Sequence, residues 1–278
     1  GFAPGAKLLP WSGDNPCSLI GVGLVQTGKV AVSLGTSDTY FGFMPEARVD
    51  PRAEGHVFGS PTGHYMSLIC FKNGSLAREA VRDGFGMDWA AFSAQIEAAP
   101  PGNLGRVMLP YFDPEITPKA LDPGVRRYRL APGDRAAARA VVEAQALSMA
   151  VHSEWMGAET ASIYATGGAS RNRTILQIFA DVHGADVYQF EVSASAALGA
   201  ALRAFHGERK AAGAPLPWPE VVQGFTAPVP ASRIAPRREY RERYAELKRL
   251  YRMCEEHTLA GGPDPSAALA AFGKKYPA

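Results

Sequence analysis

Three short segments of the sequence combine residue types that could carry chemistry, and the first is Gly13-Asp14-Asn15. The carboxylate of Asp14 could accept a proton from a substrate hydroxyl, while the adjacent amide of Asn15 could bind a second hydroxyl. The same residues suit a helix start, with Asn15 as the N-cap and Pro16 at the first helical position. Two interpretations therefore stay open, a catalytic base and an ordinary helix cap.

The second segment is a turn rich in small hydroxyl residues, SLGTSDTY at residues 33–40. Gly35 would let a phosphate group approach the backbone closely, and the amides and hydroxyls of Thr36 and Ser37 could surround its oxygens. Glycine, serine, threonine and aspartate also favour ordinary hairpin turns. The segment lacks the Gly-Lys-Thr element of a Walker A loop, so it predicts a phosphate site of another kind or a plain turn.

The third segment is ATGGASRN at residues 165–172, which follows a predicted strand and leads into a predicted helix at Asn172. Gly167, Gly168 and Ala169 have little or no side chain, so they leave room for a flat base or a ribose. The spacing is not that of a dinucleotide-binding fingerprint. A tight turn between strand and helix explains the same residues.

The elements that must position these segments follow from hydrophobic periodicity. Short apolar runs predict strands that form a small sheet of hairpins, at residues 30–34, 39–43 and 65–71. A long helix is predicted over 135–156, followed by a strand over 162–166, a helix over 172–183, a strand over 186–190 and a helix from Ser193 to Phe205. This alternation predicts a layered α/β domain whose ligands lie beyond the carboxyl ends of parallel strands.

Composition and charge exclude several classes of protein. The 278 residues include 29 basic and 27 acidic side chains, which nearly balance. The net charge of the protein is therefore too small to attract nucleic acid or an anionic membrane. The three cysteines and six histidines show no metal-binding spacing, and an odd number of distant cysteines argues against a disulfide framework. No signal pattern or bilayer-length apolar run is found. We expect a cytoplasmic protein without a protein-bound transition metal.

The carboxy-terminal part is predicted to be a surface connection from 207 to 236, a helix and a tail. Tyr240, Tyr244, Leu247 and Tyr251 mark one face of the helix, and arginine and glutamate crowd the other. The small residues and prolines after Gly261 suggest poor order. The expected division is a domain over 1–257 and a flexible tail over 258–278.

The order and spacing of the motifs resemble the carboxy-terminal domain of the FGGY carbohydrate kinases. The resemblance rests on GDN, SLGTS, TGGASRN and the helical SAALGAA at 195–201. It implies an actin-like ATPase fold of the ribonuclease-H-like type, the second domain of a two-domain sugar kinase. It also implies that Asp14 acts as base and Asn15 binds the sugar, that residues 35–37 contact the transferring phosphate, and that residues 167–172 surround adenosine. ATP would be a substrate, with Mg²⁺ carried on it.

The sequence departs from the family pattern at named positions. Many bacterial members have two alanines where this chain has Pro16-Cys17, and a GERTP-like loop, with its arginine, where it has PEITP at 114–118. The amino-terminal half of the family, with its Asp-x-Gly-Thr phosphate element, has no counterpart here, so we expect a fragment that is inactive without that half. A kinase for another ketose or polyol, or a non-catalytic actin-like nucleotide-binding module, remains an alternative.

Overall fold

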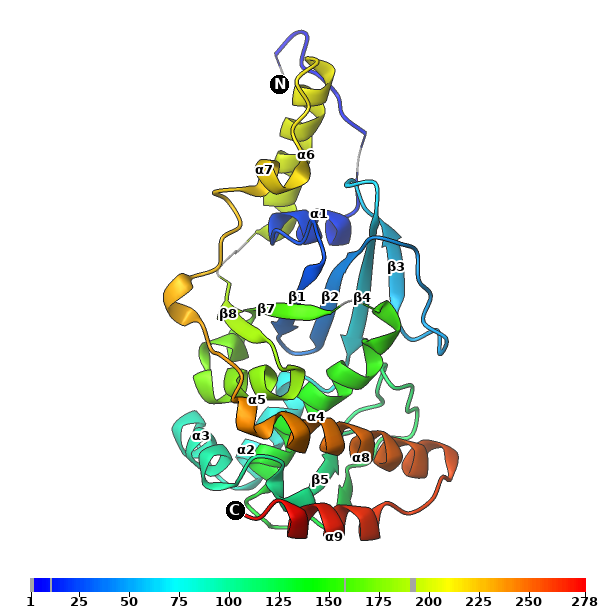
Figure 1. Cartoon of the computed structure of the whole chain (residues 1–278), viewed down its shortest axis with the longest axis vertical. Helices are drawn as coiled ribbons and strands as arrows, with labels where there is room; N and C mark the ends of the chain where they lie inside the picture. Colours follow the sequence, from blue (N-terminus) through cyan, green and yellow to red (C-terminus); the bar gives the residue numbers. More distant parts are fainter. Residues whose placement is uncertain (1–2, 11, 158, 191–193) are drawn as a thin grey trace.

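A computed structural model describes residues 3–10, 12–157, 159–190 and 194–278. Within these ranges six strands form one central sheet in the order β3-β4-β2-β1-β7-β8 (Figure 1). Strands β3, β4, β2 and β1 pair antiparallel, whereas β1 pairs with β7, and β7 with β8, in parallel. The strands are β1 (Gly28–Leu34), β2 (Asp38–Met44), β3 (His56–Gly59), β4 (Tyr65–Phe71), β7 (Thr160–Thr166) and β8 (Asp186–Gln189).

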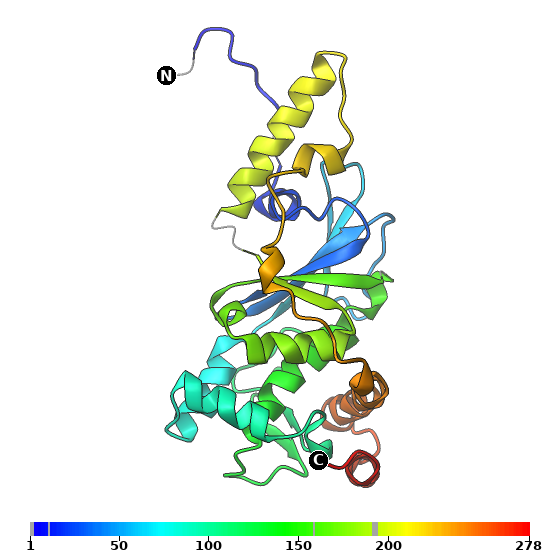
Figure 2. The ribbon, with the colours of Figure 1, turned by 60° about the vertical axis from the view of Figure 1, so that its left-hand side comes forward.

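Helices cover both faces of this sheet. Successive side chains of a strand point to opposite faces, so each strand contributes apolar side chains to both layers. Ala31 of β1 packs in a cluster with Leu19 and Val22 from the α1 side (α1, Asp14–Gly21). Val30 and Val32 pack in another cluster with α4 (Ala137–His152) and α5 (Arg173–His183). Figures 1 and 2 show α1 on one face of the sheet and α4 and α5 on the other.

The remaining helices extend the molecule beyond this core. Helix α6 crosses α1 and projects away from the sheet together with α7, whereas α2, α3, α8 and α9 gather at the opposite end (Figure 1). Their bounds are α2 (Ser75–Gly84), α3 (Trp89–Ala98), α6 (Ser195–Ala211), α7 (Trp218–Val222), α8 (Arg241–Ala260) and α9 (Ser266–Lys275). The predicted helix start at Ser193 lies outside the described residues.

The predicted α/β class and its parallel strands are confirmed, but the organisation of the sheet differs from the prediction. The strands expected as a separate sheet of hairpins join the parallel strands, because one edge of β1 pairs with β2 and the other with β7. A second, two-stranded sheet pairs β5 (Val107–Leu109) with β6 (Arg126–Tyr128).

The prediction of a flexible tail over 258–278 is wrong for the part that forms α9. Leu269 and Phe272 are fully buried in a cluster with Tyr244, Leu247 and Tyr251 of α8. The two apolar side chains, three positions apart, lie on one face of a helix. Across the described ranges, no helix combines the length and the apolar character that crossing a bilayer requires.

Candidate functional site

The second and third motifs lie side by side at the carboxyl ends of the parallel strands β1 and β7. Ser33 pairs with Thr166 in the sheet, and the Thr166 hydroxyl donates to the carbonyl oxygen of Val32 at 3.3 Å. Gly167 follows with φ +86°, and a Cβ there would lie 2.6 Å from the carbonyl oxygen of Leu34. Only glycine allows this conformation and this approach, so the two turns leave the sheet in contact.

A cavity of about 580 Å³ opens next to the third motif. Gly168, Ala169 and Asn172 line it on one side, and Trp89 of α3 lines it on another. No atom lies within 4 Å of the position that a Cβ of Gly168 would occupy, and its φ is not positive. Gly168 therefore leaves open space beside the cavity, whereas Gly167 is the residue of this motif whose backbone conformation requires glycine.

The turn at residues 35–37 is joined to this cavity through the start of α2. The backbone N–H of Ser75, which lines the cavity, donates to the carbonyl oxygen of Gly35 at 2.7 Å. A Cβ at Gly74 would lie 2.7 Å from the carbonyl oxygen of Thr36, so glycine is needed for this close contact. Thr36 is exposed and Ser37 half-buried, and neither hydroxyl is hydrogen-bonded to a described residue. Both hydroxyls can therefore meet a ligand.

A buried ion pair supports the turn from behind, and the sequence alone did not reveal it. The Arg78 guanidinium donates to both carboxylate oxygens of Asp38, at 2.7 and 3.0 Å, and also to Gln145 and Ser75. Burial raises the pKa of Asp38, and the charge of Arg78 opposes that shift. The pair fixes the first turn of α2 against β2. The signal available in the sequence was an arginine next to Ala77 on the apolar face of α2.

The proline-rich loop between β5 and β6 supports the same region. Glu115 accepts hydrogen bonds from the backbone N–H groups of Lys72 and Asn73 and from the Asn73 side chain. Ile116, at the position of the family's arginine, is 45% exposed. The loop thus holds the segment that leads into Gly74, and its acidic residue has a bracing role that the sequence did not predict.

Asn172 has a clear local role in addition to its place at the cavity. Its side-chain oxygen accepts the N–H groups of Thr174 and Ile175, which caps α5, and its amide donates to the Ser93 hydroxyl at 2.7 Å. The side chain is therefore held in one orientation by α3 and α5 together.

The first motif lies at the start of α1, the helix that covers the face of the sheet opposite to α4 and α5 (Figure 1). Asp14 and Asn15 are the first two residues of α1, and Gly13 is its N-cap, so the prediction of Asn15 as N-cap and Pro16 as first helical residue is wrong by two positions. Asp14 is exposed, and its carboxylate accepts the N–H of Asn15 at 2.8 Å. Within the described part of the chain, no hydrogen bond joins this motif to residues 35–37 or 167–172. The carboxylate is exposed at a helix start, where an approaching hydroxyl could reach it.

Comparison with known proteins bears on both the family and the extent of the chain. The sequence profile described as "FGGY family of carbohydrate kinases, C-terminal domain" matches residues 30–208. The chain is 41% identical over 279 aligned residues to a xylulose kinase from Mus musculus, covering 95% of this chain and 49% of that protein. It is 39% identical to xylulose kinase 2 from Arabidopsis thaliana, over 74% of this chain and 40% of that protein.

A solved structure shows the same fold. The ligand-bound xylulose kinase from Lactobacillus acidophilus matches with a TM-score of 0.75 at 22% identity, over 95% of this chain and 52% of that one. The chain spans about half the length of the curated relatives that it matches first.

Proposed function

Because the chain belongs to the FGGY family of carbohydrate kinases, with their actin-like ATPase fold, we propose that it is the nucleotide-binding part of a D-xylulose kinase. The reaction would transfer the terminal phosphoryl group of ATP to the terminal hydroxyl of D-xylulose, giving D-xylulose 5-phosphate. The observation that carries the proposal is 41% identity, over 95% of the chain, to a protein named xylulose kinase. The contact between the turns at 35–37 and 167–169, at the carboxyl ends of β1 and β7, supports the proposal.

The turn at residues 35–37 would bind the phosphates. Gly35 leaves the backbone open to a phosphate oxygen, and the hydroxyls of Thr36 and Ser37 are available to donate. Phosphoryl transfer depends mainly on positioning and on stabilising charge that spreads over the phosphate oxygens. The Asp38–Arg78 pair would keep this turn in place during the transfer.

The cavity beside Gly167, Gly168, Ala169 and Asn172 would hold adenosine. Its volume of about 580 Å³ lies within the ordinary range of small-molecule sites, roughly 300 to 1,000 Å³. The empty space at Gly168 and the half-exposed ring of Trp89, which is 40% exposed, offer an apolar surface for a flat base.

Asp14 would act as the general base and Asn15 would hydrogen-bond the sugar. The carboxylate is exposed, and α1 packs on the sheet through Leu19 on one side and against α6 on the other, so its position is fixed although it is not enclosed. General-base catalysis needs the acceptor within hydrogen-bond reach of the hydroxyl proton. We propose that the half present in the longer relatives brings the sugar to Asp14 and closes the cleft.

Mg²⁺ would enter with the nucleotide, where it supplies charge neutralisation between the phosphate oxygens. Among the described residues, no group of three or more histidine, cysteine, aspartate or glutamate side chains is placed to hold a metal ion. The hydroxyls of Thr36, which is exposed, and Ser37, which is half-buried, would suit a phosphate group that carries the metal.

An ADP-release assay with Mg-ATP tests the proposal. The 278-residue chain joined to an amino-terminal FGGY half should turn over D-xylulose at roughly 1 to 1,000 per second. The chain alone should bind ATP weakly and show no such turnover. A higher kcat/KM for D-ribulose or glycerol would replace the sugar assignment, and ATP binding without turnover on any sugar would favour a non-catalytic module.

A further inference from the structure

A second cavity, of about 650 Å³, lies outside the candidate nucleotide site. It is formed by the end of α3 and the loop that follows, by α4, by α5, by the chain from 234 to 240 and by Ala278. Among the described residues that line it, the charged side chains are Arg139, Arg173, Arg237 and Glu97. Three guanidinium groups and one carboxylate therefore line the cavity, while Glu143 and Asp181, which do not line it, pair with Arg139 and Arg237 and balance their charges.

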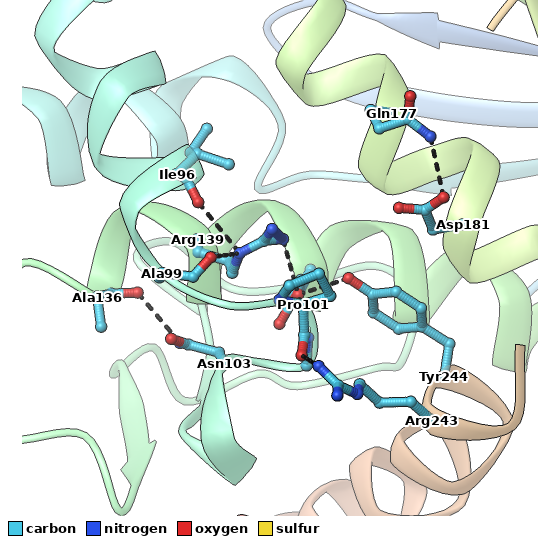
Figure 3. A network of polar contacts seen from close by, with 12 residues as sticks. Ile96, Ala99, Pro101, Asn103, Ala136, Arg139, Gln177, Asp181, Arg243 and Tyr244 are labelled. Carbon is cyan, nitrogen blue, oxygen red and sulfur yellow. Dashed lines mark hydrogen bonds and ion pairs between the residues drawn. The ribbon is translucent and has the colours of Figure 1, made fainter. Parts of the chain in front are cut away.

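Arg139 is the fixed part of this cavity. The residue is only 4% exposed, and its Nε donates to the carbonyl oxygens of Ile96 and Ala99, at 3.1 and 2.8 Å (Figure 3). Its Nη1 donates to Glu143 at 3.1 Å, and Glu143 also accepts from the Tyr244 hydroxyl at 2.8 Å. Its Nη2 has no hydrogen-bond partner among the described residues and is not among their fully buried, unsatisfied atoms. The guanidinium is therefore locked in place with one nitrogen left to bind a ligand.

The other two arginines differ in how firmly they are held. Arg237 donates through Nε and Nη2 to the buried carboxylate of Asp181, at 2.9 and 2.6 Å, which leaves Nη1 available. Arg173 is exposed in the first turn of α5 and has no ion-pair partner in the described ranges. The opposing carboxylate of Glu97 accepts a hydrogen bond from the Thr174 hydroxyl at 2.7 Å. Two anchored guanidiniums thus lie in one cavity with a movable third.

The cavity is separated from the nucleotide site by contacts between α3 and α5. The hydrogen bond from Asn172 to Ser93 belongs to the wall of the first cavity, and the one from Thr174 to Glu97 belongs to the wall of the second. Residues on opposite sides of one helical turn therefore serve different cavities. A molecule in the second cavity need not displace a nucleotide from the first.

From this geometry we infer that the second cavity is a binding site for a small organic anion that carries phosphate or carboxylate groups. Guanidinium groups form paired, charge-assisted hydrogen bonds with both kinds of oxyanion, and such bonds are strongest where water is excluded. Arg139 supplies the desolvated anchor, Arg237 a second oriented donor, and Arg173 closes over the ligand from the solvent side. The inference does not depend on the sugar that the kinase uses.

Calorimetric titration tests the site with two probes, citrate for a polycarboxylate and inorganic phosphate for a phosphate, added to the 278-residue chain with and without a non-hydrolysable ATP analogue. Arg173→Gln removes the exposed cation without disturbing the buried network. Ala98→Phe places an aromatic ring at the exposed wall of the cavity. Arg238→Gln is the matched control, because Arg238 is exposed, lies next to Arg237 and does not line the cavity.

At least one probe should bind with Kd below about 1 mM, and Arg173→Gln and Ala98→Phe should each raise that Kd about tenfold. Arg238→Gln should leave it within about twofold, and Gly168→Val, in the other cavity, should not change it. Binding of citrate alone or of phosphate alone identifies the ligand class. The inference is overturned if neither probe binds below about 10 mM, or if Arg238→Gln weakens binding as much as Arg173→Gln does.

Discussion

The carbonyl oxygen of Cys17 occupies the space in which a side chain at Gly199 would begin. The same holds in the opposite direction, because a Cβ at Gly21 would collide with the carbonyl oxygen of Ser195. Helices α1 and α6 therefore cross with their backbones in direct contact. Since Asp14 is the first residue of α1, this crossing sets where the proposed base lies.

Replacing Gly199 by alanine should destabilise the protein by about 1 to 3 kcal/mol, because the added methyl group forces the two backbones apart. Gly84→Ala is the control, since Gly84 ends α2 with no atom within 4 Å of its Cβ position and no positive φ. Urea unfolding measures both. Equal midpoints for the two variants would show that the helices can separate without cost.

In the enzyme that also contains the amino-terminal half, Asp14→Asn should lower kcat by about 10² or more while ATP affinity stays within twofold. The change removes a proton acceptor but keeps the size of the side chain, and it does not remove a cap because Gly13 is the N-cap. Asp122→Asn, at an exposed site elsewhere, is the control. A kcat within tenfold of the parent enzyme would rule out the role as base.

Gly168→Val should weaken ATP binding by roughly tenfold or more and leave sugar binding unchanged, because the side chain enters the space assigned to adenosine. The backbone there needs no positive φ, so the variant should fold. Gly59→Val, in β3 and equally open, should bind ATP like the parent. If titration gave the two variants the same ATP affinity, adenosine would have to lie elsewhere.

Asp38→Asn should cost about 3 to 5 kcal/mol of stability, because it leaves the fully buried Arg78 guanidinium without its countercharge. The exposed pair of Arg82 and Asp83 provides the comparison, and Asp83→Asn should leave the unfolding midpoint unchanged. Denaturant titration of both variants checks this. If both variants lowered the stability only slightly, a neutral hydrogen bond could replace the buried ion pair of Asp38 and Arg78.

The free energy of unfolding should fall as pH rises from about 6.5 to about 9. Burial alone would lower the pKa of His152, but a hydrogen bond to Glu255 at 3.1 Å and the carboxylate of Glu54 at 3.4 Å raise it from 6.5 to about 9. A raised folded-state pKa gives stability that is complete below pH 6.5 and is lost through pH 9. The expected loss is of the order of 3 kcal/mol.

His152→Gln separates this effect from other titrations. The variant should be less stable than the parent at pH 6, because Glu54 and Glu255 lose their cation, and it should lose less stability between pH 6.5 and 9. Urea midpoints measured across this range decide the matter. The same pH slope in both proteins would show that His152 is not the titrating group.

Local patterns predicted the elements well, and long-range pairing accounts for most of what was missed. Strand β4 matches its predicted bounds because only Ser67 interrupts its run of apolar residues. Helix α9 was missed because the prolines and small residues around it hide the pair Leu269 and Phe272, whose burial depends on α8. Propensity alone cannot show such a partner.

In the candidate site, too, features with a local cause could be predicted, whereas long-range contacts could not. The turns at 35–37 and 167–169 could be identified because glycine and other small residues mark tight turns and close approaches of the backbone. The brace between Asp38 and Arg78 joins residues 40 positions apart, and neither position is unusual by itself. Trp89 likewise reaches the first cavity only through the packing of α3 beside α5.

The place of β1 between β2 and β7 also has a consequence for synthesis on the ribosome. Strand β2 follows β1 within a few residues, but β7 ends only at Thr166. At about 5 to 20 residues per second, the β1 edge with Val30, Ala31 and Val32 therefore stays without its parallel neighbour for several seconds or more. An unpaired, apolar strand edge is a template for association between chains. The nascent chain should thus be most prone to aggregation before residue 166 emerges, and chaperone binding should be strongest in that interval.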